Sequence, residues 1–346
     1  MSAMERPAFS NSAFPEYPLD QLVSPDNIQR WTSVYGDQAQ AWLNALPAIV
    51  HDYAEKWELT IEEPLEGGTV SAVIGARRHD EHTVLKIHPP WLMPVVPRKT
   101  SAETEAAAFG IWDGQGAPRL LANDTRGLLL ERIIDAHHSP DMDAADMADL
   151  VSRIDRVLSL KAMMLGIPPI VMEIEKRFGR AAAKGHPEIS TEVLLNARNI
   201  ASHLCSYPLS DGVNFPRSTV LVHGDLKIKN VLERPDGTKY VVDPSPAIGN
   251  PLYDATLWTI DKPEGIAERC DDMAYNLEIN PRIIGNLAVA LAVSEVCLAS
   301  PARAAATLEY VRDFAGTSDL QKYFFDEQRI FDTNNDYLLP YNYGSR

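Results

Sequence analysis

The chain contains 346 residues, of which 45% are hydrophobic and 23% are charged, and this balance supplies enough apolar side chains for a folded core. At roughly 150 residues per domain, the length corresponds to about two domains or to one enzyme of two lobes. The 48 Asp and Glu residues outnumber the 32 Lys and Arg residues, giving a formal net charge of −16 at pH 7. This charge disfavours nucleic acids and anionic membranes, which are bound through clustered Lys and Arg, and favours a cationic small molecule as the partner.

The cysteines and the apolar segments indicate a cytoplasmic protein. Cys205, Cys270 and Cys297 are widely spaced and form no CxxC pair, so we expect buried thiols in a reducing compartment. The N-terminal segment lacks the apolar core of roughly 7–15 residues that a signal peptide needs. The most apolar later run, Leu287–Ala299, is shorter than the roughly 18 residues of a membrane span and predicts a buried core helix.

The first part of the chain changes from irregular to helical to β-prone. Residues 1–30 are rich in Pro, Ser and aromatic side chains with no clear period, and they predict an N-terminal arm. Apolar residues at spacings of three and four predict an amphipathic helix over Asp37–Trp57. Short β-prone runs separated by turn residues then predict an antiparallel meander, with runs at Leu59–Ile61, Thr69–Ala76 and Thr83–Ile87.

A helix is predicted to restart after Thr100, where Glu103 is placed to complete a capping box, and to run to about Trp112. Two further β-prone runs follow, Arg119–Ala122 and Gly127–Ile133. Residues 31–133 are therefore expected to form an N-terminal lobe with a small antiparallel sheet and one helix.

The rest of the chain, residues 134–346, is expected to form a larger helical lobe, so the fold class is α+β. Its helical runs are Met142–Met164, Ile170–Lys184, Thr191–Cys205, Arg282–Leu298 and Ala302–Phe314. Two β-type runs, Thr219–His223 and Lys239–Val242, interrupt this pattern and flank a charged loop that includes a tight Pro-Asp-Gly turn.

The segment Leu221–Pro246 carries the strongest chemical signal. Asp225 follows the first β-type run, Asn230 comes five residues later, and Asp243 ends the next hairpin. Two carboxylates and a carboxamide on converging loops suit a hard cation such as Mg²⁺. Phosphoryl transfer needs one carboxylate to orient a hydroxyl and further oxygens to hold the metal. Each residue alone is also an ordinary turn former, but the joint pattern favours a kinase site with Asp225 in the first role and Asn230 and Asp243 in the second.

The run His223-Gly224-Asp225-Leu226, with Asn230 and Asp243-Pro244, resembles the HGDL…N…DP signature of aminoglycoside phosphotransferases and related small-molecule kinases. Five short runs resemble the branch of this family that contains streptomycin 6-phosphotransferases and aminoglycoside or hydroxyurea resistance kinases. They are AWLNALP, GGTVSAV, EAAAFGIWDG, LLLERI and DPSPAIGNPLYDATLW. The resemblance extends from about Trp31 to Ala315. It implies a bilobal, protein-kinase-like fold.

The resemblance also implies roles for residues of the N-terminal lobe and the hinge. Lys86 would hold the α- and β-phosphates of ATP, and Glu105 would pair with it. Glu103 is the competing partner, but we assign Glu103 to the helix cap. Glu131 and Ile133 lie in the hinge, whose backbone would contact the adenine.

In the C-terminal lobe the resemblance implies supporting roles. His223 would brace the loop, and Asp254 would accept hydrogen bonds from the loop backbone.

The chain departs from the family pattern at two points. It has no GxGxxG motif, and the candidate phosphate loop is Gly67-Gly68-Thr69-Val70-Ser71, in which backbone N–H groups and the Ser71 hydroxyl would have to serve. Lys227 stands where these kinases frequently have histidine, and it would reach the transferred phosphate as a point charge.

The resulting hypothesis is an ATP- and Mg²⁺-dependent phosphotransferase acting on a hydroxyl of an aminoglycoside antibiotic, with streptomycin as the first candidate. Two alternatives stay open: a kinase of another hydroxylated metabolite or peptide antibiotic, and a catalytically silent nucleotide-binding protein. The sequence leaves the oligomeric state and the role of the N-terminal arm undetermined.

Overall fold

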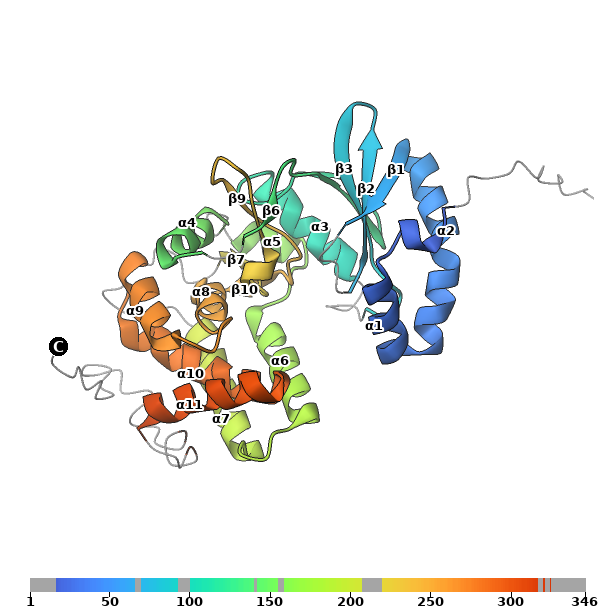
Figure 1. Ribbon diagram of the computed structural model, residues 1–346. Coiled ribbons are helices and arrows are strands. Elements are labelled where there is room, and N and C mark those ends of the chain that lie inside the picture. Colours follow the sequence, from blue (N-terminus) through green and yellow to red (C-terminus); the bar gives the residue numbers. More distant parts are fainter. Residues whose placement is uncertain are drawn as a thin grey trace, which may run out of the picture. The chain divides into compact units, whose positions relative to one another are not determined.

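The computed structural model describes residues 17–65, 70–92, 100–139, 142–154, 159–206 and 220–316, together with Leu320 and Phe324. The chain divides into two units, and Figure 1 labels helices and strands from both. The first unit comprises Met1–Met93 and Leu121–Arg132, and the second comprises Pro94–Leu120 and Ile133–Arg346. The chain therefore enters the second unit for the last time between Arg132 and Ile133.

The first unit begins with a 3-10 turn, η1 (Leu19–Gln21), and two helices, α1 (Pro25–Tyr35) and α2 (Asp37–Trp57). Helix α1 starts within the range 1–30, for which the sequence predicts an irregular arm. The Ser24 side chain caps this helix by accepting the Asn27 N–H, and Pro25 occupies the first turn, where no N–H is needed. Residues 1–16 of the expected arm lie outside the described residues.

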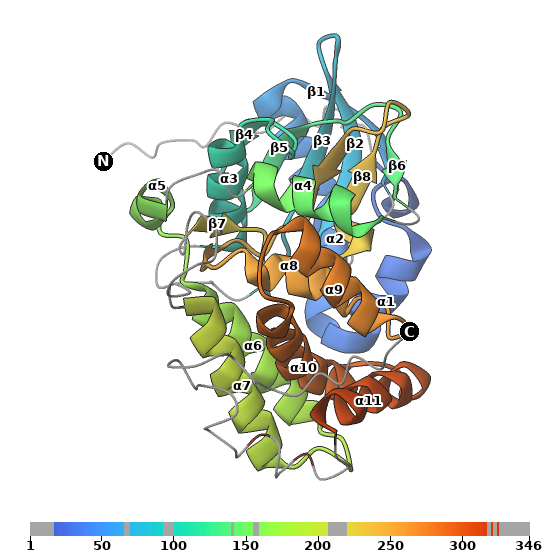
Figure 2. The ribbon, with the colours of Figure 1, turned by 90° about the vertical axis from the view of Figure 1, so that its left-hand side faces the viewer.

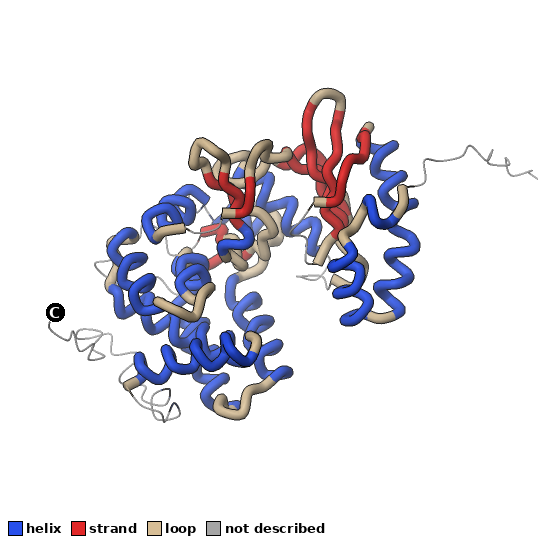
Figure 3. Tube along the Cα trace, viewed as in Figure 1, coloured by secondary structure: helices blue, strands red, loops and turns tan. Residues whose placement is uncertain are grey.

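A five-stranded sheet follows, with strand order β1-β2-β3-β5-β4. The strands are β1 (Leu59–Pro64), β2 (Ala72–Arg78), β3 (Glu81–Ile87), β4 (Leu120–Asn123) and β5 (Gly127–Glu131). The pairs β1–β2, β2–β3 and β3–β5 are antiparallel, and Figure 3 shows these strands in red. The antiparallel meander predicted from the sequence is confirmed.

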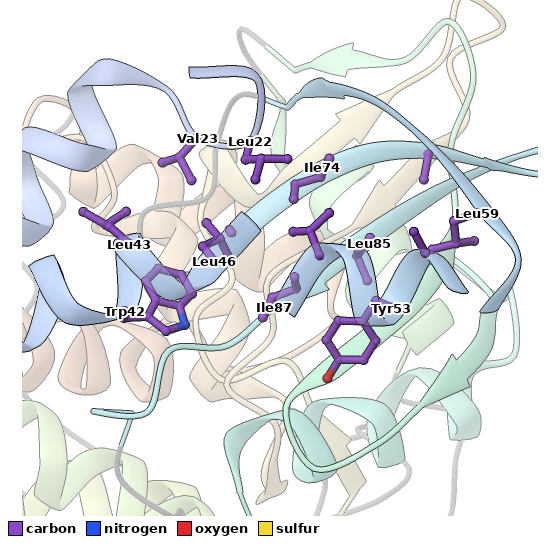
Figure 4. Close-up of a cluster of buried hydrophobic side chains, with 14 of the residues drawn as sticks. Leu22, Val23, Trp42, Leu43, Leu46, Tyr53, Leu59, Ile74, Leu85 and Ile87 are labelled. Atoms are coloured by element: carbon purple, nitrogen blue, oxygen red, sulfur yellow. The ribbon is translucent and has the colours of Figure 1, made fainter. Parts of the chain in front are cut away.

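The core of the first unit lies between α2 and one face of this sheet. Figure 4 shows Trp42, Leu46 and Tyr53 of α2 beside Leu85 and Ile87 of β3. Successive residues of a strand point to opposite faces, so the alternation that buries Leu85 and Ile87 against α2 directs the residue between them to the other face. That residue is the predicted phosphate ligand, Lys86.

The second unit is mostly helical. Its helices are α3 (Ser101–Trp112), α4 (Ala144–Ile154), α5 (Ser159–Met164), α6 (Ile170–Lys184), α7 (Thr191–Ser206), α8 (Leu252–Thr259), α9 (Ile266–Asn276), α10 (Pro281–Leu298) and α11 (Pro301–Ala315). The single helix predicted over Met142–Met164 is present as α4 and α5, and residues 155–158 between them lie outside the described part of the chain.

Helix α10 is the centre of the second unit. It packs against α6, α7, α8, α9 and α11, and Figure 2 shows it beside α6 and α11. Among the described residues it is the one helix that is long and apolar enough to cross a membrane, but 83% of it is buried inside the protein. Such burial is typical of a core helix, as the sequence predicted.

Helix α3 belongs to the second unit, although the sequence places it in the N-terminal lobe. Its capping box is confirmed: the Thr100 side chain accepts the Glu103 N–H, and the Glu103 carboxylate accepts the Thr100 N–H. At its other end, the Trp112 indole Nε1 donates to Ile154 O of α4 at 3.1 Å.

Five short strands frame the loop His223–Asn230, which we call the Asp225 loop. Strand β7 (Val220–Val222) leads into it and pairs with β10 (Ala247–Gly249). The 3-10 turn η2 (Ile228–Asn230) ends it and continues into the predicted hairpin of β8 (Val231–Glu233) and β9 (Lys239–Val241), beside β6 (His137–His138).

Candidate active site

The Asp225 loop begins with a sharp backbone turn at Gly224. The φ angle of Gly224 is +80°, a region that side chains disfavour, and a Cβ atom there would lie 1.9 Å from the backbone oxygen of Ser245. The Ser245 N–H in turn donates to His223 O at 2.8 Å. Glycine is therefore required here, because the loop passes directly against the segment that follows Asp243.

The carboxylate of Asp254 in α8 stabilises this turn through two hydrogen bonds. It accepts the N–H of His223 at 2.5 Å and the N–H of Gly224 at 2.8 Å, which confirms the supporting role expected for it. Burial raises the pKa of Asp254 to about 7, and the two N–H groups act in the opposite direction.

His223 is fully buried and joins the loop to the β8–β9 hairpin. Its Nε2 lies 2.9 Å from Val242 O, and its Nδ1 lies 3.3 Å from the Asp225 N–H. Because a carbonyl needs a donor and an N–H needs an acceptor, these partners assign a neutral ring protonated on Nε2. Burial lowers the pKa of His223, although Val242 O and nearby carboxylates oppose the shift. The ring stacks on Trp112 of α3, with centroids 6.2 Å apart and an interplanar angle of 15°.

Asp225 is surrounded by three polar side chains, of which Asn230 and Lys227 are predicted site residues and Lys229 is not. Asn230 Nδ2 donates to Asp225 O at 2.8 Å and to Asp225 Oδ2 at 3.3 Å. Lys227 Nζ lies 3.5 Å from Asp225 Oδ1, and Lys229 Nζ lies 3.8 Å from Oδ2. The Asp225 side chain is 36% exposed, so a solute can reach its carboxylate. Lys229 was not predicted, although a lysine four residues after Asp225 is spaced for an ion pair with it.

Asp243 approaches the same region from the end of the hairpin. It has a φ angle of +55°, unusual for a residue with a side chain, and the preceding Val242 N–H donates to Asn230 O at 2.9 Å. The charges of Asp225, Asp243 and Glu105 all act on the pKa of His223. These three carboxylates are therefore within electrostatic range of one imidazole ring.

The remaining predicted residues belong to the first unit or to the point where the chain returns to the second. Lys86 and Ser71 are buried in the first unit, with 6% and 4% of their surface exposed, and Ser71 Oγ lies 3.4 Å from His88 Nδ1. Glu131 ends β5 in the first unit, whereas Ile133 is the first residue of the chain's return to the second. Gly67, Gly68 and Thr69 of the expected phosphate loop lie outside the described residues.

The side-chain oxygens of Asn230 and Asp243 are of the chemical kind that Mg²⁺ binds. The described residues contain no group of three or more His, Cys, Asp or Glu side chains that could hold a metal ion by themselves. Asn230 uses its Nδ2 for both of its bonds to Asp225, which directs its Oδ1 to other partners. One amide oxygen and nearby carboxylates match a cation that takes one or two protein carboxylates and completes its shell with phosphates and water.

Comparison with solved structures defines the class of fold. Choline kinase LicA from Streptococcus pneumoniae aligns with a TM-score of 0.50 and 13% identity, covering 81% of this chain and 99% of that one. A choline/ethanolamine kinase family protein from Mesorhizobium loti aligns with a TM-score of 0.51 and 15% identity, covering 83% and 97%. The predicted α+β, bilobal, protein-kinase-like fold is confirmed.

Sequence comparison then gives the family. The profile of the aminoglycoside/hydroxyurea antibiotic resistance kinases matches residues 56–309. Streptomycin 6-kinase from Streptomyces glaucescens is 30% identical over 259 residues, which cover 72% of this chain and 76% of that protein. Hydroxyurea phosphotransferase from Kitasatospora aureofaciens is 27% identical over 234 residues, covering 64% and 63%. The chain belongs to the aminoglycoside/hydroxyurea antibiotic resistance kinase family and is an aminoglycoside phosphotransferase.

Proposed function

We propose that this enzyme transfers the γ-phosphoryl group of ATP to a hydroxyl of streptomycin, acts in the cytoplasm, and thereby confers resistance. The observation that carries the proposal is the arrangement of Asn230 and Lys227 around the exposed carboxylate of Asp225. Family membership supports the reaction type, and the name of the Streptomyces glaucescens relative supports the acceptor.

Asp225 orients the acceptor hydroxyl and accepts its proton. The hydroxyl oxygen forms a bond to the γ-phosphorus while the bond from that phosphorus to the β,γ-bridging oxygen breaks, and ADP leaves. Lys227, at 3.5 Å from Asp225, supplies positive charge where the transferred group gains electron density. Because the protein makes no covalent bond in this scheme, its contribution is positioning and charge neutralisation.

Asn230 and Asp243 are the residues that would hold Mg²⁺, which neutralises the phosphates when it is bound. Lys86 holds the α- and β-phosphates of ATP with Glu105 as the partner of the lysine. Ser71 lies near the phosphates, and the backbone from Glu131 to Ile133 contacts the adenine.

The acceptor is a cation in this proposal, and the formal charge of −16 supports that assignment because an acidic surface raises the local concentration of cations. Hydroxyurea is the second candidate acceptor, supported by the family description and by the Kitasatospora aureofaciens relative. A peptide antibiotic or another hydroxylated metabolite is the wider alternative.

The test is an assay of ADP release with MgATP and a panel of acceptors: streptomycin, other aminoglycosides, hydroxyurea and a peptide antibiotic. We expect streptomycin to give the highest kcat/KM, with a phosphorylated product of the corresponding mass. Asp225→Asn should lower kcat by about 10²-fold or more, because it removes the proton acceptor while keeping the shape of the side chain.

Asp236→Asn is the matched control. It makes the same substitution in the exposed turn of the β8–β9 hairpin, where an asparagine oxygen can still accept the Thr238 N–H. This variant should retain wild-type kcat. Phosphorylation of hydroxyurea alone would replace streptomycin as the acceptor, and full turnover by Asp225→Asn would exclude Asp225 from its proposed role.

A further inference from the structure

A second carboxylate, Asp261, contacts the far half of the Asp225 loop. Asp261 lies two residues beyond the end of α8, and its Oδ2 accepts the N–H of Ile228 at 3.1 Å. Ile228 is the first residue of η2, the turn that ends in Asn230. Asp254 and Asp261, seven residues apart in one segment, therefore contact the beginning and the end of the same loop.

The Asp261 carboxylate forms a long ion pair with Arg303 of α11. Arg303 Nη2 lies 4.0 Å from Asp261 Oδ1, donates to Ile260 O at 3.3 Å, and lies 3.2 Å from Glu295 Oε1. The other oxygen of Glu295 accepts a hydrogen bond from Arg177 Nη2 at 2.7 Å. Two guanidinium groups and two carboxylates, with equal numbers of positive and negative charges, thus form a series of ion pairs that runs from α6 to the Asp225 loop.

Three of these four side chains are largely buried. The side chains of Glu295 and Asp261 are 11% and 15% exposed and that of Arg177 is 6% exposed, whereas that of Arg303 is 31% exposed. Charged groups in such surroundings are screened little by water, and a charged partner makes a hydrogen bond roughly twice as strong as a neutral one does. The bond from Ile228 N–H to Asp261 is therefore anchored to the helical core of the second unit.

This anchor bears on the groups that surround Asp225. Lys227 is the N-cap of η2, and the Asn230 N–H donates to Lys227 O at 2.9 Å, so this bond joins the two residues across the turn. The same turn presents the Asn230 side chain to Asp225. A displacement of about 1 Å in such groups can lower turnover by up to about 10²-fold.

We propose that Asp261 is a positioning residue for phosphoryl transfer, because its carboxylate fixes the turn that carries Lys227 and Asn230. The inference rests on the proposed function for its kinetic consequence only. Asp261 touches neither the acceptor nor the nucleotide in this proposal, and it acts through the Ile228 N–H.

The experiment compares Asp261→Ala, Asp261→Asn and Asp313→Ala in the full chain. Alanine removes the acceptor of the Ile228 N–H, whereas asparagine keeps an acceptor oxygen at the same place. Asp313 is an exposed residue of α11, so Asp313→Ala controls for the loss of one acidic side chain. Three quantities are measured: kcat and KM for the acceptor, the Mg²⁺ concentration at half-maximal rate, and amide hydrogen exchange of the peptide covering residues 225–231.

We expect Asp261→Ala to lower kcat by about tenfold or more, to raise the Mg²⁺ requirement, and to leave acceptor KM within about twofold. Exchange in the 225–231 peptide should become faster. Asp261→Asn should restore kcat to within about threefold of wild type, and Asp313→Ala should match wild type in every measurement. A purely structural role would instead lower the melting temperature of the alanine and asparagine variants equally, with wild-type kcat in both.

Wild-type kcat, or unchanged exchange of the 225–231 peptide, in Asp261→Ala would overturn the inference. If Asp261→Ala does not fold, Asp261→Glu, which keeps the charge but displaces the carboxylate, is measured with the same expectations. If the wild-type enzyme phosphorylates none of the acceptors, the proposed function fails. Exchange then still decides the inference, because faster exchange in Asp261→Ala than in Asp261→Asn supports it and equal exchange rejects it.

Discussion

The amide nitrogen of Asn230 donates to both the backbone oxygen and the carboxylate of Asp225, at 2.8 Å and 3.3 Å. This pair of bonds fixes which end of the Asn230 amide faces Asp225, and it directs the carbonyl end toward other partners. One side chain therefore restrains the proposed proton acceptor, and its oxygen is the proposed ligand of Mg²⁺.

Two substitutions of Asn230 separate these contributions. Asn230→Asp keeps an oxygen for Mg²⁺ but places two carboxylates against each other, whereas Asn230→Ala removes both the donor and the oxygen. We expect both variants to lose about 10²-fold or more in kcat, and only Asn230→Ala to raise the Mg²⁺ concentration needed for half-maximal rate. Steady-state kinetics at varied Mg²⁺ checks this, and an equal Mg²⁺ requirement in the two variants would contradict it.

The turn at Gly224 provides a second prediction with an internal control. Gly224 and Gly237 have nearly equal φ angles, +80° and +81°, but a Cβ atom at Gly237 would meet nothing within 4 Å. Gly237→Ala should cost about 1 kcal/mol of unfolding free energy, the strain of a left-handed alanine. Gly224→Ala adds a clash with Ser245 O and should cost about 4 kcal/mol or more, with loss of activity. Urea denaturation measures both costs, and similar values would show that the Ser245 contact is unimportant.

His223 predicts a pH dependence of stability. Burial lowers its pKa in the folded protein, so below pH 6.5 the unfolded chain binds a proton that the folded chain does not. Its contribution is complete above pH 6.5 and is lost as the pH falls below that value. His223→Gln keeps a nitrogen donor for Val242 O but does not titrate.

The measurement is urea denaturation of wild type and His223→Gln at pH 7.5 and pH 5.5. The stability advantage of wild type over the variant should shrink at pH 5.5. Because other buried groups such as Asp254 titrate in both proteins, the difference between them isolates His223. A constant difference would contradict the prediction.

Asp124 predicts a separate acid transition in the first unit. Burial opposes its ionisation, but hydrogen bonds from Lys56, Tyr53 and two backbone N–H groups prevail and lower the pKa of Asp124 to about 2. Its contribution is therefore complete above pH 4 and is lost between pH 4 and pH 2, and we expect about 1 kcal/mol after allowance for its partial exposure. Asp124→Asn should remove this part of the acid dependence, measured by urea denaturation from pH 5 to pH 2. If the free energy of unfolding of Asp124→Asn falls as steeply between pH 4 and pH 2 as that of wild type, the prediction is wrong.

Much of the helical structure was predictable because its apolar period is strong. Helix α2 was predicted with its observed bounds, and α10 and α11 begin within one residue of their predicted starts. Helix α8 was not predicted: every residue from Leu252 to Thr259 is buried, so the polar face that reveals an amphipathic helix is missing. Strand β10 was also missed, since three residues within a Pro-rich run carry no usable alternation.

Local spacing predicted the candidate site where its residues are neighbours in the sequence, and the family resemblance added the supporting role of Asp254. Asp225, Lys227 and Asn230 lie within six positions, and the structure keeps them together. The stacking of Trp112 on His223 joins residues far apart in the chain, and so does the hydrogen bond from Ile228 to Asp261. Such contacts depend on tertiary packing, which no local pattern encodes.

The central position of α10 affects how the second unit can fold during synthesis. Helices α6, α7, α8 and α9 all pack against α10, and α10 is the next to last described helix of the chain. During synthesis these four helices leave the ribosome before the apolar surface that covers them exists. The core of the second unit can therefore be completed only after residue 298 has emerged, and until then the apolar faces of these helices are exposed to aggregation.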